Sequence, residues 1–171
     1  MSPPEIPLFD LLTRQPLPHE GLGDVLPFSQ TCEDRFREIV QEARSRAREV
    51  FDSVIGEDRE SVYTLEALIE EIWGQGWTPQ SANVDLFATD FGSLLTSCLS
   101  EELGGQLVFR SETDLSHLSC WWRLSQIEAF PFHKVYKRLV VREGESLSFY
   151  FSALERMLRS GVNTSTDHES S

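Results

Sequence analysis

The side chains that could do chemistry in this 171-residue sequence are histidines, cysteines and neighbouring acids. His117 and Cys120 lie three positions apart, which on a strand directs their side chains to opposite faces and argues against a nucleophile–base pair or a shared metal. His133 and Lys134 follow Pro131 at the start of an expected helix, where they could help to bind an anion. The plainer interpretations are a buried polar strand residue for His117 and helix-surface residues for the other two.

Neighbouring carboxylates occur at Glu70–Glu71 and at Glu101–Glu102. Adjacent helical residues diverge by about 100 degrees, so neither pair alone presents two converging carboxylates. Glu66 and Glu70 do share a helix face, and we interpret them as a solvated stripe, because no His or Asp recurs at metal-ligand spacing. The sequence therefore predicts no metal site and no cofactor.

Recognisable catalytic motifs are missing from the sequence. It contains no phosphate-binding glycine loop, no Gly-x-Ser-x-Gly elbow, no Cys-x-x-Cys pair and no dinucleotide fingerprint. This weighs against an enzyme without excluding a site built from distant residues. Such a site would lie in a pocket between sheet and helices, with His117, His133 or Glu102 contributing.

Two consecutive tryptophans, Trp121 and Trp122, fall in an expected strand, which directs one indole to each side. One indole belongs in the core, and the other needs cover from the N-terminal segment, another layer or a partner. This aromatic cluster is a candidate contact surface, and a strand buried on both sides is the alternative. The candidate binding residues are Trp77, Trp121, Trp122, Glu66, Glu70, Lys134 and Arg138.

Charge is segregated along the chain, whose formal net charge is −13. Residues 58–105 hold nine acids and a single basic residue, whereas residues 106–160 hold eight basic and six acidic residues. An acidic surface repels nucleic acid and anionic membranes, so the composition argues against both as partners and permits a basic protein partner. Acidity that only keeps the protein soluble is the plainer interpretation.

The cysteines and the N-terminal residues indicate the cellular compartment in which the protein is expected. The three cysteines, Cys32, Cys98 and Cys120, are odd in number and far apart, which favours reduced thiols over a disulfide framework. The N-terminus lacks the basic start and apolar stretch of a signal peptide, and no apolar run approaches bilayer-spanning length. We therefore expect a cytoplasmic protein with no membrane partner.

Hydrophobic periodicity predicts a single α+β domain over residues 31–160, in which a small antiparallel sheet of two or three strands packs against about five helices. We expect an apolar, proline-rich arm (residues 1–30) to drape over it, with a docking motif at Pro7–Leu12 as the alternative, and a disordered polar tail at 161–171. Gly104 is expected to close a helix in the left-handed conformation. The expected helices run from Thr31 to Gly56, through Val62–Trp73, from about Asn83, from Pro131 and after Ser146, and the expected strands are Gln106–Arg110, His117–Leu124 and Ser125–Phe130.

Four stretches resemble a family of small uncharacterised bacterial domains: Phe91-Gly92-x-x-Leu95, Glu101-Glu102-Leu103-Gly104-Gly105, Pro131-Phe132-x-x-Val135-x-Lys137-Arg138-Leu139 and Ser146-Leu147-x-Phe149-Tyr150. The resemblance covers roughly residues 60–158 and implies a fold but no activity. Relatives often place an acidic residue soon after the Phe-Gly pair and a Trp after the Gly-Gly pair. This chain has Ser93 and Gln106 there, so if the family has a polar site at these positions, the resemblance implies that this member has lost it.

The leading functional hypothesis is a non-enzymatic cytoplasmic interaction protein, adaptor-like or immunity-like, whose acidic middle helices and aromatic strand meet an unidentified protein. A second hypothesis is a small-molecule binder or hydrolase that uses the pocket described above. A third is a self-associating scaffold, in which the acidic 58–105 face of one copy meets the basic Lys134–Arg142 helix of another.

Overall fold

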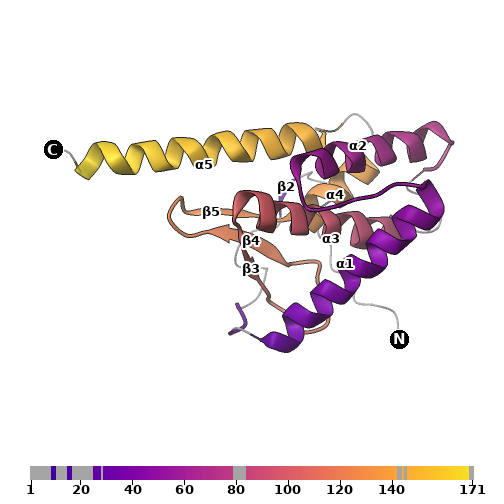
Figure 1. The fold of residues 1–171 in the computed structure, drawn as a ribbon, viewed down its shortest axis with the longest axis horizontal. Coiled ribbons are helices and arrows are strands. Elements are labelled where there is room, and N and C mark those ends of the chain that lie inside the picture. The colour runs from indigo at the N-terminus through magenta and orange to yellow at the C-terminus, as the bar shows by residue number, and fades with distance from the viewer. Residues whose placement is uncertain are drawn as a thin grey trace.

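A computed structural model describes residues 25–27, 29–78, 84–141, 144 and 146–169, and the backbone of two short strands at 9–10 and 15–16. Its helices are α1 (Gln30–Phe51), α2 (Arg59–Gly74), α3 (Val84–Leu103), α4 (Pro131–Val140) and α5 (Leu147–Glu169). Strands β3 (Gln106–Val108), β4 (Ser119–Trp122) and β5 (Ile127–Ala129) form an antiparallel sheet in that order, while β1 (Phe9–Asp10) pairs with β2 (Gln15–Pro16). The predicted α+β class, with a small antiparallel sheet and five helices in the described part of the chain, is confirmed (Figure 1).

Side-chain caps begin three of the helices. Ser29, Asp58 and Ser146 each accept a hydrogen bond from a backbone N–H in the first turn of the following helix, over 3.3, 3.0 and 3.1 Å. The sequence predicts Ser146 in this role, but it starts α1 at Thr31, two residues after the observed cap. Pro131 is the first residue of α4, as predicted, because its missing N–H has no partner to lose at that position.

Left-handed residues end two of the helices. Gly104 has φ 74° directly after α3, in the conformation that the sequence predicts there. α1 ends at Phe51, earlier than the predicted end at Gly56, because Asp52 has φ 51° and turns the chain out of the helix. Aspartate tolerates this conformation better than most residues other than glycine, since its short polar side chain can hydrogen-bond locally.

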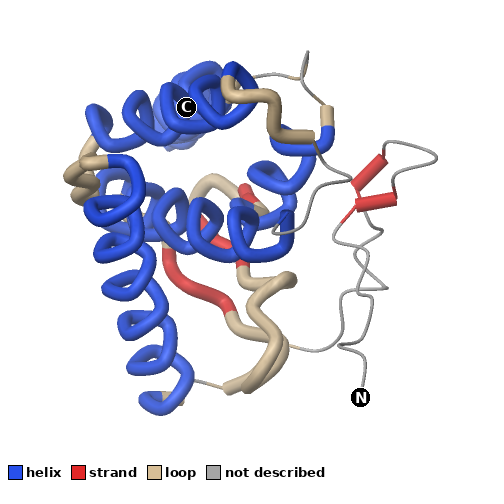
Figure 2. The backbone as a smooth tube through the Cα atoms, turned by 90° about the vertical axis from the view of Figure 1, so that its right-hand side faces the viewer, coloured by secondary structure: helices blue, strands red, loops and turns tan. Residues whose placement is uncertain are grey.

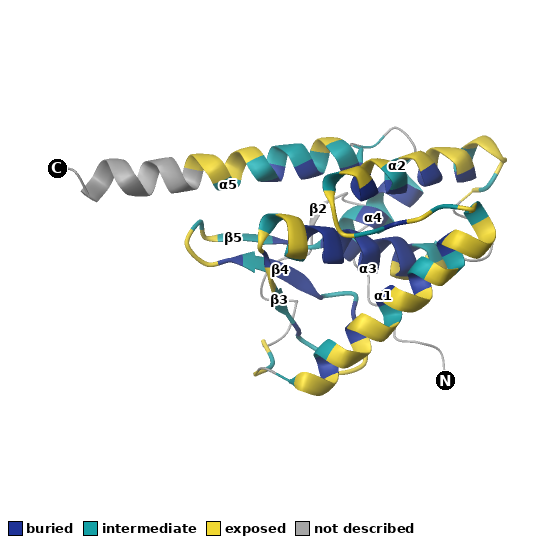
Figure 3. Cartoon of the chain, in the orientation of Figure 1, coloured by how far each residue is buried: buried dark blue, intermediate teal, exposed yellow. Residues whose placement is uncertain are grey.

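Helix α3 is the centre of the fold and packs against α1, α2, α4 and β4 (Figures 1 and 2). Every residue from Asp90 to Leu99 is buried, so α3 is enclosed around its circumference and not only along the predicted apolar face (Figure 3). Two hydroxyls in this stretch find acceptors in their own helix: Ser93 donates to the Asp90 carbonyl (2.8 Å) and Thr96 to the Gly92 carbonyl (2.7 Å). Satisfying these donors locally removes most of the cost of burying them.

The contact between α3 and α4 depends on a glycine. A Cβ at Gly92 would lie 2.6 Å from the Phe132 ring, closer than two non-bonded carbon atoms can approach. The missing side chain therefore lets α4 pack directly on the α3 backbone, which places the basic helix beside the centre of the fold.

One face of the sheet packs on α3. Leu107, Cys120 and Ala129 are register partners across the three strands and share that face. Cys120 Sγ lies 3.9 Å from the Thr96 carbonyl of α3. Strand β4 is shorter than predicted, and His117 lies in the turn that precedes it, so its expected place on a strand is wrong.

The two ends of the chain differ in what is described. Most of the predicted arm (residues 1–30), including most of Pro7–Leu12, lies outside the described residues; β1 lies near α4. The backbone of α5 stays helical through 161–169, a stretch for which the sequence predicts a disordered tail. Extending an existing helix gains one hydrogen bond for each residue fixed, which offsets the modest propensity cost of Ser, Thr and Asn. None of the described helices combines the length and apolarity needed to cross a membrane.

Candidate functional site

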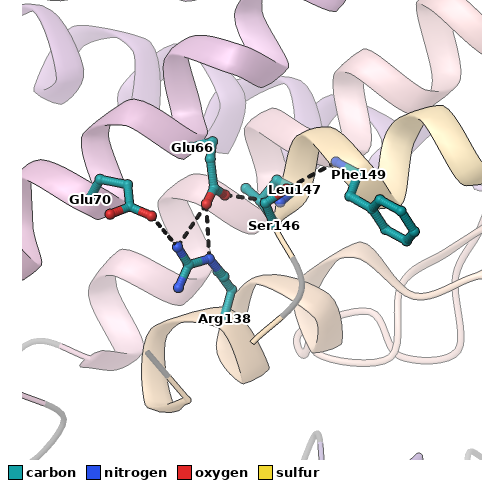
Figure 4. Close-up of polar contacts among 6 residues, drawn as sticks. All are labelled: Glu66, Glu70, Arg138, Ser146, Leu147 and Phe149. Carbon is teal, nitrogen blue, oxygen red and sulfur yellow. Dashed lines mark hydrogen bonds and ion pairs between the residues drawn. The ribbon is translucent and has the colours of Figure 1, made fainter. Parts of the chain in front are cut away.

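Arg138 of α4 joins three helices at one point. Its Nε and Nη2 donate to Glu66 Oε1 of α2 over 3.0 and 2.7 Å, and Nη2 also contacts Glu70 Oε1 at 2.6 Å (Figure 4). Glu66 Oε2 accepts a hydrogen bond from the Leu147 amide at the start of α5 (2.9 Å). Both carboxylate oxygens of Glu66 are thus occupied by charge-assisted or backbone hydrogen bonds, which fixes α2, α4 and α5 relative to one another.

Three of the predicted binding residues are therefore used within the chain. The Arg138 side chain is 3% exposed and Glu66 is 13% exposed, whereas Glu70 is 64% exposed. Since Arg138 is buried, an external partner cannot reach its guanidinium in this fold. Basic and acidic halves of the sequence meet here inside one molecule.

Two further ion pairs tie distant elements. Arg46 of α1 makes a bidentate pair with the buried Asp90 of α3, with Nε to Oδ2 at 2.7 Å and Nη2 to Oδ1 at 2.6 Å. Hydrogen bonding to Asp90 raises the pKa of Arg46 above its usual value. Arg59 of α2 pairs with Glu155 of α5. Arg46 thus reaches across from α1 to α3.

The paired tryptophans lie on opposite faces of β4. Trp122 is 8% exposed, and its Nε1 donates to the Leu103 carbonyl at the end of α3 (2.8 Å). Trp121 is half-buried and shares its face with Glu128 of β5, its register partner. Trp122 is therefore a core residue whose polar atom is satisfied, and of the two indoles only Trp121 retains partial exposure.

Trp77 belongs to a different aromatic group. Its ring lies 5.4 Å from Trp73 and 5.6 Å from Phe87, both in edge-on geometry. This group packs α3 against the end of α2. Lys134 lies over the Tyr150 ring of α5 at 5.2 Å. The predicted surface residues thus lie in separate parts of the fold.

A buried polar cluster occupies the second face of the sheet. Arg110 Nη2 donates to Glu128 Oε1 (2.7 Å), Arg110 Nη1 contacts Ser119 Oγ (3.0 Å), and Ser119 Oγ donates to Glu128 Oε1 (2.6 Å). The side chains of Arg110 and Glu128 are 5% and 9% exposed. The Ser119 hydroxyl therefore contacts both members of the Arg110–Glu128 salt bridge. It donates its proton to the Glu128 carboxylate, which is already paired with the Arg110 guanidinium.

His133 and His117 lie within electrostatic range of each other. Burial, reinforced by the charges of His117 and Lys137, lowers the pKa of His133 to about 4, so its imidazole is neutral at pH 7. A neutral His133 adds no positive charge for an anion at the start of α4. Glu102, the third member of the predicted pocket, is exposed in the last turn of α3.

The thiols are unsuited to nucleophilic chemistry. Cys32, Cys98 and Cys120 are all free and buried. Burial raises the pKa of Cys98 and of Cys120 to about 12, so both are protonated thiols at neutral pH. The reactive form of cysteine is the thiolate, which is negligible under these conditions.

A groove of about 440 Å³ lies between α1, the C-terminal part of α3 and strand β3. Apolar side chains of Phe36, Val40 and Leu107 line it, and none of the residues that the sequence singles out for a pocket does. Its charged lining residues are Glu33, Arg37, Arg44, Glu57 and Glu101.

Sequence reasoning misses this groove because its walls come from three separated segments without a shared motif. The nearest signal is the Gly104–Gly105 break, which correctly places the start of β3 but not the helix opposite it. Within the described ranges there is no group of three or more His, Cys, Asp or Glu side chains arranged to hold a metal ion.

No protein-family model matches this chain, and no curated protein or solved structure shows significant similarity to it. The resemblance to small uncharacterised bacterial domains therefore stays a prediction that depends on four short stretches.

Proposed function

We propose that this protein is a non-enzymatic interaction domain that recognises a basic protein partner through the acidic surface of its middle helices. The exposed acids of residues 58–105 carry this proposal, because they outnumber the exposed basic residues described in 106–160, which are Arg123, Arg156 and Arg159. Arg110 and Arg138, from the basic half, are buried in ion pairs. The acids of residues 58–105 that are exposed are Asp58, Glu60, Glu70, Glu71, Asp85, Glu101 and Glu102.

Such a surface affects mainly the rate at which a partner associates and the choice of partner. Complementary charge steers a partner during diffusion and suppresses partners of like charge, while contributing less to affinity than the apolar centre of an interface. The free thiols and the neutral His133 give catalysis no comparable support. An adaptor or immunity-like role fits by analogy with small acidic inhibitors.

The test is affinity capture with the tagged full chain from its native cell, at low and high salt. Surface attractions act over about 30 Å at 0.01 M salt but only about 3 Å at 1 M. We expect a basic protein that is retained at low salt and released at high salt. Absence of any such protein at low salt would contradict the proposal.

A matched pair of variants separates a specific acidic face from net charge. Glu101→Gln with Glu102→Gln removes two exposed acids at the end of α3, and Glu38→Gln with Glu112→Gln removes two exposed acids elsewhere. We expect the first pair to weaken capture and the second to leave it nearly unchanged. Equal weakening by both pairs would indicate nonspecific attraction by net charge and count against the proposed face.

A further inference from the structure

Strand β3 is an edge of the sheet. In the part of the chain that the structure describes, β3 pairs only with β4, and the groove runs beside it with Gly105, Gln106 and Leu107 in its lining. The opposite wall is α1, which runs alongside the sheet (Figure 2). A groove between an edge strand and a helix is the geometry in which extended peptides add to a sheet.

A hydrogen bond next to β3 indicates which backbone groups face outward. The Phe109 carbonyl accepts the Leu26 amide at 2.8 Å, so the segment that contains Leu26 already contacts the chain just beyond β3. Backbone groups of alternate residues point to the same side of an antiparallel strand. The N–H and C=O of Leu107, two residues earlier, therefore face the same side as the Phe109 carbonyl.

We propose that the groove binds an extended basic segment of the partner protein, which adds to β3 as a further antiparallel or parallel strand. This inference depends on the proposed function and names the form in which the partner is recognised. The segment would exchange hydrogen bonds with the Leu107 backbone and place an apolar side chain against Phe36 and Val40.

The charges of the groove favour a basic segment. Arg44 pairs with Glu57 (2.9 Å) and Arg37 with Glu33 (3.7 Å), so each arginine of the lining is already balanced by a carboxylate. Glu101 is exposed and has no ion pair with another described residue. A Lys or Arg of the ligand would supply its counter-charge.

The length of β3 limits the affinity. Its three residues span about 10 Å, which accommodates about three residues of an added strand. We expect the isolated segment to bind weakly and the complete partner to add affinity through its contacts with the acidic face.

The probe is a displayed library of unstructured linear peptides, each with one central apolar residue flanked by Lys and Arg, selected on the full chain. The best peptide is then resynthesised with single backbone N-methyl groups at each position. Strand addition predicts that N-methylation weakens binding at least about tenfold at alternate positions and little at those between them. Amide exchange at Leu107 should slow on binding.

Two tryptophan variants test the place of binding. Gln41 is exposed and lines the groove, and Glu38 is exposed on α1 but does not line it. Gln41→Trp should weaken the peptide at least about tenfold, because the indole fills the groove, while Glu38→Trp should bind as the parent does.

Several results would overturn strand addition. They are the absence of any selected peptide, N-methyl sensitivity without alternation, equal binding by both tryptophan variants, and a dimer of the parent chain that Gln41→Trp dissociates, which would assign the groove to a second copy. If capture of a basic partner still depends on Glu101 and Glu102, the interaction domain stands and only the strand addition fails. If that capture also fails, both proposals fall.

Discussion

Replacing Arg138 by methionine should destabilise the fold more than any surface charge change. The substitution keeps an unbranched apolar stem but removes the guanidinium that contacts Glu66 and Glu70. It leaves Glu66, at 13% exposure, as a nearly buried carboxylate that accepts the Leu147 amide and has lost its guanidinium partner. Removing one partner of a buried ion pair typically costs about 3–5 kcal/mol.

The two carboxylates should contribute unequally to this cost. Glu70 is 64% exposed, so its pair with Arg138 is screened by water and worth about 1 kcal/mol or less. Most of the loss therefore arises from Glu66. Adding Glu66→Gln to Arg138→Met removes the unpaired charge while keeping an amide oxygen for Leu147, and should restore about 1–2 kcal/mol.

Urea unfolding followed by circular dichroism at pH 7 measures these differences, with Glu70→Ala as the matched single-carboxylate control. For a chain of this length, a loss of about 3–5 kcal/mol corresponds to a fall in Tm of roughly 6–20 °C. A loss below about 1 kcal/mol for Arg138→Met, or no recovery on adding Glu66→Gln, would refute the interpretation of Glu66 as a buried charge that needs Arg138.

Three other perturbations follow from the same structure. Gly92→Ala places a methyl group 2.6 Å from the Phe132 ring and should cost about 1–3 kcal/mol in urea unfolding, while an unchanged midpoint would argue against close α3–α4 packing. Asp90→Asn, which weakens the bidentate pair with Arg46, should cost about 1–3 kcal/mol and less in high salt, since Arg46 is 39% exposed. The lowered pKa of His133, about 4 against an unfolded value of about 6.5, means that the unfolded state binds more protons between these values. The unfolding free energy should therefore fall by about 1–2 kcal/mol from pH 7 to pH 4, after allowance for partial exposure, and His133→Gln should reduce this fall, a difference that urea titrations at the two pH values would reveal.

Local signals were enough to predict most of the elements. The Gly104–Gly105 break, Pro131 and Ser146 each mark a boundary through backbone geometry or a missing donor, and these properties belong to the residue itself. The order of helices and strands could therefore be read from the sequence, along with the change of period after α3. The exceptions are also local: the sequence predicts that this helix ends at Gly56, whereas the left-handed Asp52 ends α1 four residues earlier.

Long-range pairing could not be read in the same way. Arg138 and Glu66 are 72 positions apart, Arg46 and Asp90 are 44 apart, and Arg110 and Glu128 are 18 apart. On the surface of a helix or a strand each of these charges fits a solvated position equally well, because the periodicity of an element carries no information about which element packs opposite. The groove could not be predicted for the same reason, since its existence depends on how α1 lies relative to β3.

The internal ion pairs change which residues are able to take part in recognition. An isolated arginine is too costly to bury, so a buried arginine needs a carboxylate partner. Glu128 is that partner for Arg110, and Glu66 is that partner for Arg138. Those four charges cancel within the molecule and contribute little to the field outside it. The acids that remain exposed, Glu101 and Glu102 among them, therefore set the surface potential on their side of the molecule, although the sequence gives them no distinguishing motif. A loss of binding after substitution of Glu66 would report unfolding as readily as recognition, whereas the same loss at Glu101, with the urea midpoint unchanged, would report recognition alone.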